Sequence, residues 1–226
     1  GQGTYFWDAS TDAIFYDSEG VVTQKSYMEF DGTGDSFSGG FGLDDIWDNT
    51  GAVSGWIYPR TDGEDSKGTI ISKVQAGSGR WRIYVNGEGS STTDGGVTGR
   101  IGTRLWFGRD RSTDGIWNTS YHLPLKQWSH FLILYNDNST ANNPFIYING
   151  KEMSLTESST PSGIGTSDAN SELFIGEYEG CESFDGNIAD LAVYTTFSKN
   201  NLAEYRKYAR EIYNDRRPFN HKDWRE

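Results

Sequence analysis

Cysteine is almost missing from this chain, since Cys181 is the only one among 226 residues. An intrachain disulfide is therefore excluded, and the fold depends on its hydrophobic core for stability. Proline is scarce, with five residues, and no apolar run approaches the ~18 residues that a membrane-spanning helix needs. The sequence therefore predicts a protein that does not insert into a membrane.

Positive charge is also in deficit, and the formal net charge is −12. This charge argues against nucleic acid or an anionic membrane as the main partner. Residues 199–226 differ from the rest, because eight Lys or Arg outnumber five Asp or Glu and leave the remaining residues at −15. A basic tail on an acidic body is either a docking element or ordinary solvated charge at a terminus.

Glycine and aromatic residues, by contrast, are abundant. There are 28 glycines, well above the usual ~7%, and aromatics make up 15% of the chain. At least eight short apolar runs, separated by turn residues, follow one another with little helix between them. This pattern predicts an all-β fold of two antiparallel sheets, a sandwich or jelly roll.

Three local patterns are especially clear. Residues 80–85 alternate strictly, so Trp81, Ile83 and Val85 should be buried while the side chains between them face water. Asn149-Gly150 between two strand-like runs predicts a type I′ hairpin, because both positions need positive φ. A helix is expected from Ser198, with an apolar stripe that should lie on the sandwich. The stripe consists of Leu202, Tyr205, Ala209 and Ile212.

The order of these segments resembles the laminin-G-like jelly roll of the concanavalin A-like lectin/glucanase superfamily. The motifs that carry the resemblance are "YMEFDGTGDSF", "VSGWIYP", "LPLKQWSHFLILYND", "PFIYINGKEM" and "LFIGEYEGCESFDGNIADLAVYTT" before "FSKNNLAEY". They span roughly residues 27–213. We therefore expect an N-terminal arm or first strand over residues 1–26, a sandwich over 27–197, and a short helix with an extending tail over 198–226.

Aspartates at two Phe-Asp-Gly turns raise the question of a cation. The resemblance implies a structural calcium near these turns, and the matching residues here are Asp31, Asp35 and Asp190. The apolar spacing of "FDGNIADLAVY" slips by one residue, which predicts a β-bulge near Ala189–Asp190. In the alternative interpretation, Asp31 and Asp185 only favour their turns through local hydrogen bonds.

Two acidic loops contain the parts of a sugar site. "LDDIWDNT" offers Trp47, Asp48 and Asn49, and "STDGIWNTS" offers Trp117 and Asn118. A sugar is recognised by an aromatic face together with planar hydrogen-bonding groups. In the alternative interpretation, each tryptophan belongs to the core and the acids are only solvated.

Catalysis is not expected. Catalytic glucanases of the superfamily that this chain resembles carry two glutamates on one strand, in a pattern close to Glu–x–Asp–x–x–Glu, and no such run occurs here. His130 is interpreted as a packed structural residue, and Cys181 as a buried, inert thiol.

The predicted function is therefore non-catalytic recognition of a glycan or glycoprotein, in an extracellular, cell-surface or virion-surface setting. The alternative is a structural subunit of a virion, appendage or surface layer. In that case the terminal arms, with Phe219 and Trp224, would contact neighbouring subunits in an oligomer.

Overall fold

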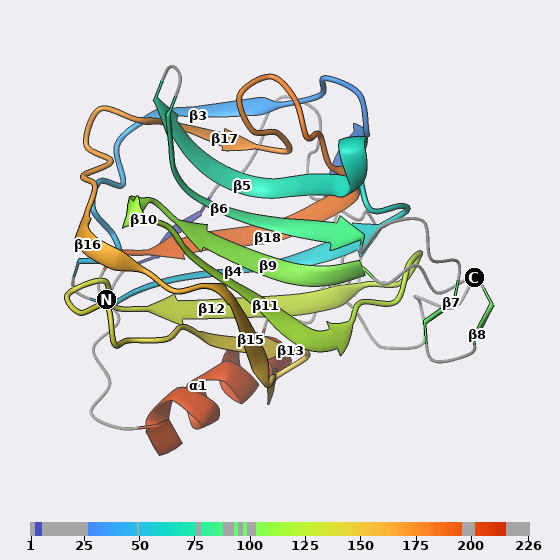
Figure 1. Ribbon diagram of the computed structural model, residues 1–226. Coiled ribbons are helices and arrows are strands. Elements are labelled where there is room, and N and C mark those ends of the chain that lie inside the picture. The colour runs from blue at the N-terminus through green and yellow to red at the C-terminus, as the bar shows by residue number, and fades with distance from the viewer. Residues whose placement is uncertain are drawn as a thin grey trace, which may run out of the picture.

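Two seven-stranded antiparallel sheets face each other in the computed structural model, and the one α-helix of the described residues lies outside them (Figure 1). The structure describes residues 3–5, 27–48, 50–75, 78–87, 93–94, 97–98, 103–195 and 202–215. The all-β sandwich of two antiparallel sheets predicted from the sequence is confirmed.

The back sheet has the strand order β1-β18-β4-β12-β13-β14, with β2 also pairing with β18. The bounds of its strands are β1 Gly3–Tyr5, β2 Met28–Asp31, β4 Gly51–Pro59, β12 Ser129–Tyr135, β13 Phe145–Ile148, β14 Lys151–Glu152 and β18 Asp185–Tyr194. Every residue of β12 is buried, as expected for a central strand that packs on both faces.

The front sheet has the strand order β15-β11-β9-β6-β5-β17-β3. Its strands are β3 Phe37–Phe41, β5 Lys67–Gln75, β6 Ser78–Gly87, β9 Thr103–Arg109, β11 Gly115–His122, β15 Leu155–Ser159 and β17 Glu172–Ile175. The remaining short elements are β7 Thr93–Asp94, β8 Val97–Thr98, β10 Arg111–Thr113, β16 Ser162–Gly165 and a 3-10 helix, Glu64–Ser66.

The core lies between the two sheets and is rich in aromatic rings. Trp81, Ile83 and Val85 of β6 are buried, as their alternation predicts. The prediction that Tyr84 faces water is wrong, because other side chains cover it on the outer face and leave it 3% exposed. They join one large apolar cluster with residues of β4, β12 and β18 from the opposite sheet. Two buried ion-pair networks border this cluster, one around Lys73 and Asp168 and the other around Asp137.

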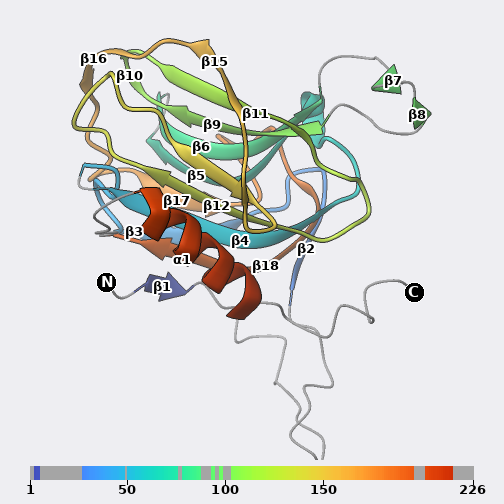
Figure 2. The same cartoon turned by 90° about the horizontal axis from the view of Figure 1, so that it is seen from below.

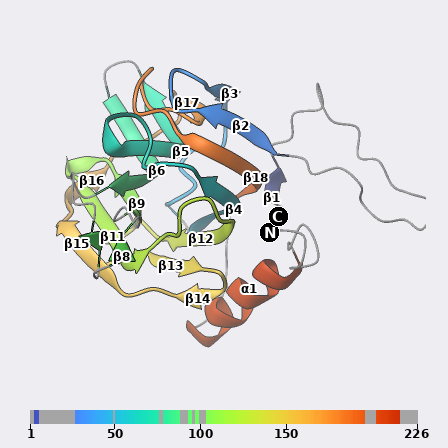
Figure 3. The same ribbon diagram turned by 90° about the vertical axis from the view of Figure 1, so that its right-hand side faces the viewer.

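Helix α1, Leu202–Asp215, covers the outer face of the back sheet (Figures 2 and 3). Tyr205, Ala209 and Ile212 pack against Leu132, Leu134 and other side chains of that sheet, so the predicted apolar stripe is confirmed for these positions. The hairpin turn predicted at Asn149-Gly150 is also confirmed, because the two residues have φ of 51° and 74°.

Candidate functional site

The outer face of the front sheet differs from that of the back sheet, because no helix of the described chain covers it (Figure 1). Strand alternation turns one set of side chains from β6, β9 and β11 into the core and the other set outward. The register places Tyr84, Trp106 and Asn118 in one row across this face. A neighbouring row contains Arg82, Gly108 and Ile116. We call these two rows the aromatic–arginine face.

Arg82 is held at one end of this face between two aromatic rings. Its guanidinium carbon lies 4.2 Å from the ring centroid of Tyr84 and 4.5 Å from that of Tyr178. The Glu182 carboxylate pairs with Arg82 and also accepts a hydrogen bond from Lys67 Nζ at 2.8 Å. These contacts fix a planar cation between the buried Tyr84 ring and the half-buried Tyr178 ring.

Arg104 occupies the other end of the face, and its position is fixed by hydrogen bonds. Its Nε donates to His122 Nε2 at 2.8 Å, and Nη1 donates to Asn118 Oδ1 at 3.4 Å. The Asn118 amide in turn donates to Ser158 Oγ at 2.7 Å. Asn118 is only 2% exposed, so it orients the arginine from below.

Gly108 leaves open space in the row of Arg82, and the row of Trp106 lies between it and Arg104. Gly108 stands opposite Arg82 on one side and Ile116 on the other. A Cβ atom built on Gly108 would meet only the Arg82 side chain, at 3.9 Å, so there is open space above this residue. The half-buried Trp106 indole stands two residues before it on β9 and packs on the Tyr84 ring, 5.8 Å between centroids. The face therefore combines an aromatic side chain, open space at a glycine and two oriented guanidinium groups.

Tyrosine ionisation gives a prediction about alkaline stability. Burial raises the pKa of Tyr84, Tyr135 and Tyr147 from 10.0 to about 12. The native state therefore keeps these phenols protonated where the unfolded chain has lost the protons, and stability falls as pH rises from 10 towards 12. Thermal melts over this range, with tyrosinate absorbance, should show a falling midpoint and a late-titrating group of tyrosines. Uniform titration near pH 10 with a constant midpoint would contradict this.

The tryptophans that the sequence analysis placed in a sugar site are buried. Trp47 is 0% exposed and Trp117 is 1% exposed, and both rings contact Phe107 and Tyr135 in the core. Neither ring offers a face on which a sugar could stack, so the proposed sugar-stacking role is wrong for both. The alternative interpretation, in which they belong to the core, fits the structure.

The polar neighbours of these tryptophans are dispersed. Asp48 is exposed as a residue, but its carboxyl group is partly buried. This partial burial, together with nearby carboxylates, raises its pKa. Asn118 lies on the opposite side of the front sheet from the Trp117 ring, because adjacent strand residues point to opposite faces. Asn49, Phe219 and Trp224 lie outside the described residues, so their predicted roles stay predictions.

The three aspartates expected to share a calcium ion do not come together. Asp31 accepts a hydrogen bond from Thr33 N at 2.9 Å, and Asp35 accepts one from Asp31 N at 3.0 Å, so both serve their own turn. Asp31 pairs in register with Asp185, and Asp190 lies five residues further along β18. That is roughly 15 Å at the usual rise per residue. Within the described residues no group of three or more His, Cys, Asp or Glu could hold a metal.

The β-bulge predicted near Ala189–Asp190 is confirmed. The register between β18 and β4 shifts between Ala189 and Ala192, and Asp190 has a φ of 49°.

Cys181, expected to be buried, is exposed in a tight turn, and its thiol contacts the Tyr178 carbonyl oxygen at 3.1 Å. Burial and nearby carboxylates raise the pKa of this thiol, which disfavours the reactive thiolate.

Sequence reasoning did not select Trp106, Arg104 or Gly108. The signal was present in "TRLWFGR", where Leu105 and Phe107 alternate with these three residues. Because β9 is central in the front sheet, a tryptophan on its outward side is unusual and could have been noticed.

The comparisons with known proteins agree with this architecture. A family profile described as "Concanavalin A-like lectin/glucanases superfamily", Laminin_G_3, matches residues 31–198. The chain therefore belongs to this laminin-G-type family of the concanavalin A-like superfamily. The superfamily name covers both lectins and glucanases. A search of curated proteins finds no match.

Several solved structures align with this chain at low sequence identity. The receptor-binding domain of botulinum neurotoxin mosaic serotype C/D aligns with a TM-score of 0.57 and 14% identity, over 95% of this chain and 46% of that chain. A pentraxin from Limulus polyphemus aligns with a TM-score of 0.49 and 13% identity, over 83% and 73%. Domain 4 of an extracellular arabinanase from Geobacillus stearothermophilus, in complex with arabinotriose, aligns with a TM-score of 0.45 and 18% identity, over 82% and 70%.

Proposed function

We propose that this protein is a non-catalytic carbohydrate-recognition module that binds a glycan, free or on a glycoprotein, on its aromatic–arginine face. The observation that carries the proposal is the outward row of Trp106 beside Tyr84, flanked by the oriented guanidinium groups of Arg82 and Arg104. Membership of a superfamily that includes lectins supports the same class of function.

The chemistry of this face suits a sugar. A pyranose ring presents a C–H surface that packs on an aromatic side chain, and its hydroxyl groups need planar donors and acceptors at the edges. Trp106 and Tyr178 supply aromatic surface, and Arg82 and Arg104 supply donors in fixed orientations. Since neighbouring groups already hold both arginines, little side-chain entropy is lost on binding.

The strands that form the face are poor in catalytic groups. Glycoside hydrolysis needs a pair of carboxyl groups on either side of the scissile bond. Strands β6, β9 and β11 contain no Asp or Glu at any position. We therefore propose binding without cleavage.

The setting that we propose is extracellular or at a cell or virion surface, where glycans are displayed. No helix in the described part of the chain is long and apolar enough to cross a membrane. The alternative role as a structural subunit depends on Phe219 and Trp224, which the structure does not describe, and it stays a prediction.

Two variants test the proposed face on a glycan array. Trp106→Ala removes the aromatic side chain, and Gly108→Leu fills the open space where a Cβ atom has room. Each is expected to weaken glycan binding at least about tenfold, roughly 1.4 kcal/mol, while the thermal midpoint changes little. The control is Ile164→Ser, which removes an apolar side chain that is 88% exposed on β16, outside the face.

The outcomes separate clearly. Loss of binding in Trp106→Ala and Gly108→Leu, but not in Ile164→Ser, supports the aromatic–arginine face. Glycan binding that survives both face variants would show that the site lies elsewhere. Release of reducing ends from a bound polysaccharide would contradict the non-catalytic part of the proposal.

A further inference from the structure

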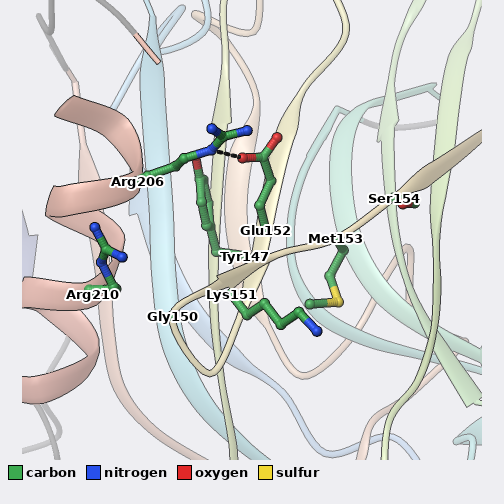
Figure 4. Close-up of a pocket in the computed structure, with 8 residues that line it drawn as sticks. All are labelled: Tyr147, Gly150, Lys151, Glu152, Met153, Ser154, Arg206 and Arg210. Carbon is green, nitrogen blue, oxygen red and sulfur yellow. Dashed lines mark hydrogen bonds and ion pairs between the residues drawn. The ribbon is translucent and has the colours of Figure 1, made fainter. Parts of the chain in front are cut away.

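A cavity of ≈ 560 Å³ lies between helix α1 and the β13–β14 hairpin, on the side of the back sheet that the helix covers (Figure 4). It is lined by Tyr147, Gly150, Lys151, Glu152, Met153, Ser154, Arg206 and Arg210. Its size is within the range of small-molecule sites in proteins. It is separate from the aromatic–arginine face, which belongs to the other sheet.

The lining carries an excess of positive charge in a strongly acidic protein. The lining contains three positively charged side chains, Arg206, Arg210 and Lys151, and one negatively charged side chain, Glu152. The chain as a whole, by contrast, has a net charge of −12. Arg206 Nε donates to Glu152 Oε2 at 2.6 Å. Within the described chain, Arg210 and Lys151 form no ion pair. Two cations are therefore left to interact with an anionic group that enters the cavity.

Tyr147 supplies an independent reason to expect a ligand. Its side chain is 1% exposed, and its phenol oxygen has no hydrogen-bond partner among the described groups. Figure 4 shows the ring running beside the Arg206–Glu152 pair. Burial, then the Glu152 carboxylate, raise the pKa of this phenol to about 12, so it remains an O–H donor at neutral pH. An unsatisfied buried donor has a free-energy cost that a ligand acceptor would remove.

The ion pair at the mouth of the cavity can be exchanged. The Arg206 and Glu152 side chains are 54% and 29% exposed, and exposed ion pairs contribute only about 0–1 kcal/mol. An incoming carboxylate or sulfate can replace Glu152 at Arg206 at little cost, because guanidinium groups bind oxyanions in a bidentate manner. Such a replacement brings an acceptor next to the Tyr147 phenol.

We infer that this cavity is a second binding site, which accepts a saccharide carrying one carboxylate or sulfate group. Arg206 and Arg210 bind the oxyanion, Tyr147 donates a hydrogen bond to it, and the remaining volume of the ≈ 560 Å³ cavity accommodates the sugar ring. The inference does not rest on the proposed function of the aromatic–arginine face, since the two sites share no residue.

The inference is tested by titrating the full chain with glucuronate, glucose 6-sulfate, neutral glucose and inorganic sulfate. Binding is monitored by NMR and calorimetry. Saturable binding of at least one acidic sugar is expected, at least about tenfold tighter than glucose and tighter than sulfate. Arg210→Gln and Tyr147→Phe should each weaken it several-fold. Neither should unfold the protein, because Arg210 is exposed and the Tyr147 oxygen has no partner to lose.

Lys207→Gln is the matched control, since it removes one positive charge from the same helix at a residue outside the cavity lining. If Arg210→Gln and Lys207→Gln weaken binding of the acidic sugar equally, the effect is general charge attraction, and the inference is overturned. Sulfate binding as tight as glucose 6-sulfate would overturn the saccharide assignment. The same titration on Trp106→Ala should be unchanged, which distinguishes failure of this site from failure of the aromatic–arginine face.

Discussion

Replacing Asp137 with alanine is expected to lower the free energy of unfolding by about 3–5 kcal/mol, the largest effect of any single charge removal considered for this protein. Asp137 is the common partner of two buried arginines. Its Oδ2 accepts from Arg109 Nε and its Oδ1 from Arg111 Nε, each at 2.8 Å. The side chains of all three residues are at most 3% exposed.

The physical reason is desolvation. Each guanidinium group has given up its water, and within the described residues the Asp137 carboxylate is the one negative charge paired with both of them, beside hydrogen bonds to backbone carbonyl oxygens. Alanine at this position leaves two like charges close together in the protein interior. The ion pairs of Asp137 with Arg109 and Arg111 also connect β9 and β10 to the end of β12. Without them, the two sheets lose this connection at one end.

Urea unfolding of Asp137→Ala and Asp110→Ala measures the effect against a close control. Asp110 lies between the same two arginines in sequence, but it pairs with Arg80 at side-chain exposures of 22% and 13%. Its removal should cost only about 0–1 kcal/mol. Equal losses in the two variants would show that burial of the Asp137 network is not what stabilises the fold.

Replacing Trp47 with alanine is expected to cost about 3–5 kcal/mol of stability and to leave glycan affinity per folded molecule unchanged. Its ring lies 5.3 Å from that of Trp81 and 5.0 Å from that of Phe107, between centroids, and it is completely buried. Alanine would leave a large cavity between the two sheets, because the rigid strands around it can collapse only in part.

The conservative variant Trp47→Phe separates the core role from a ligand role. Phenylalanine keeps most of the buried ring, so stability should recover by more than half while binding stays at the parental level. Chemical denaturation gives the first quantity, and titration with a glycan selected on the array gives the second. A fully stable Trp47→Ala protein that has lost glycan binding would restore Trp47 as a ligand residue.

Short-range patterns in the sequence predicted several elements correctly. The Asn149-Gly150 turn, the alternation of Trp81, Ile83 and Val85, and the bulge at Asp190 each follow from local rules. These rules act within a few residues, so no knowledge of the partner strand is needed. The same is true of the stripe that places α1 on the sandwich.

The residues of the candidate site were harder to predict, because loops have no period from which the direction of a side chain can be read. Trp47 and Trp117 stood in acidic, turn-rich segments that look exposed, yet both rings point into the core. Trp106 stood in a strand that looks structural, yet its side chain is on the outward face. An aromatic residue suits either environment, so residue type alone does not decide between them.

The sequence by itself determined the class of fold, the family, the hairpin, the bulge and the covering helix, since strand alternation, turn chemistry and helical periodicity are local. Only the tertiary structure decided which aromatic rings face outward, that Asp190 lies far from Asp31, and that Tyr147 meets Arg206 and Arg210 beside one cavity. These arrangements depend on strand register and on contacts between residues far apart in the chain. Such pairings minimise the free energy of the whole molecule and leave no mark on any short stretch of sequence.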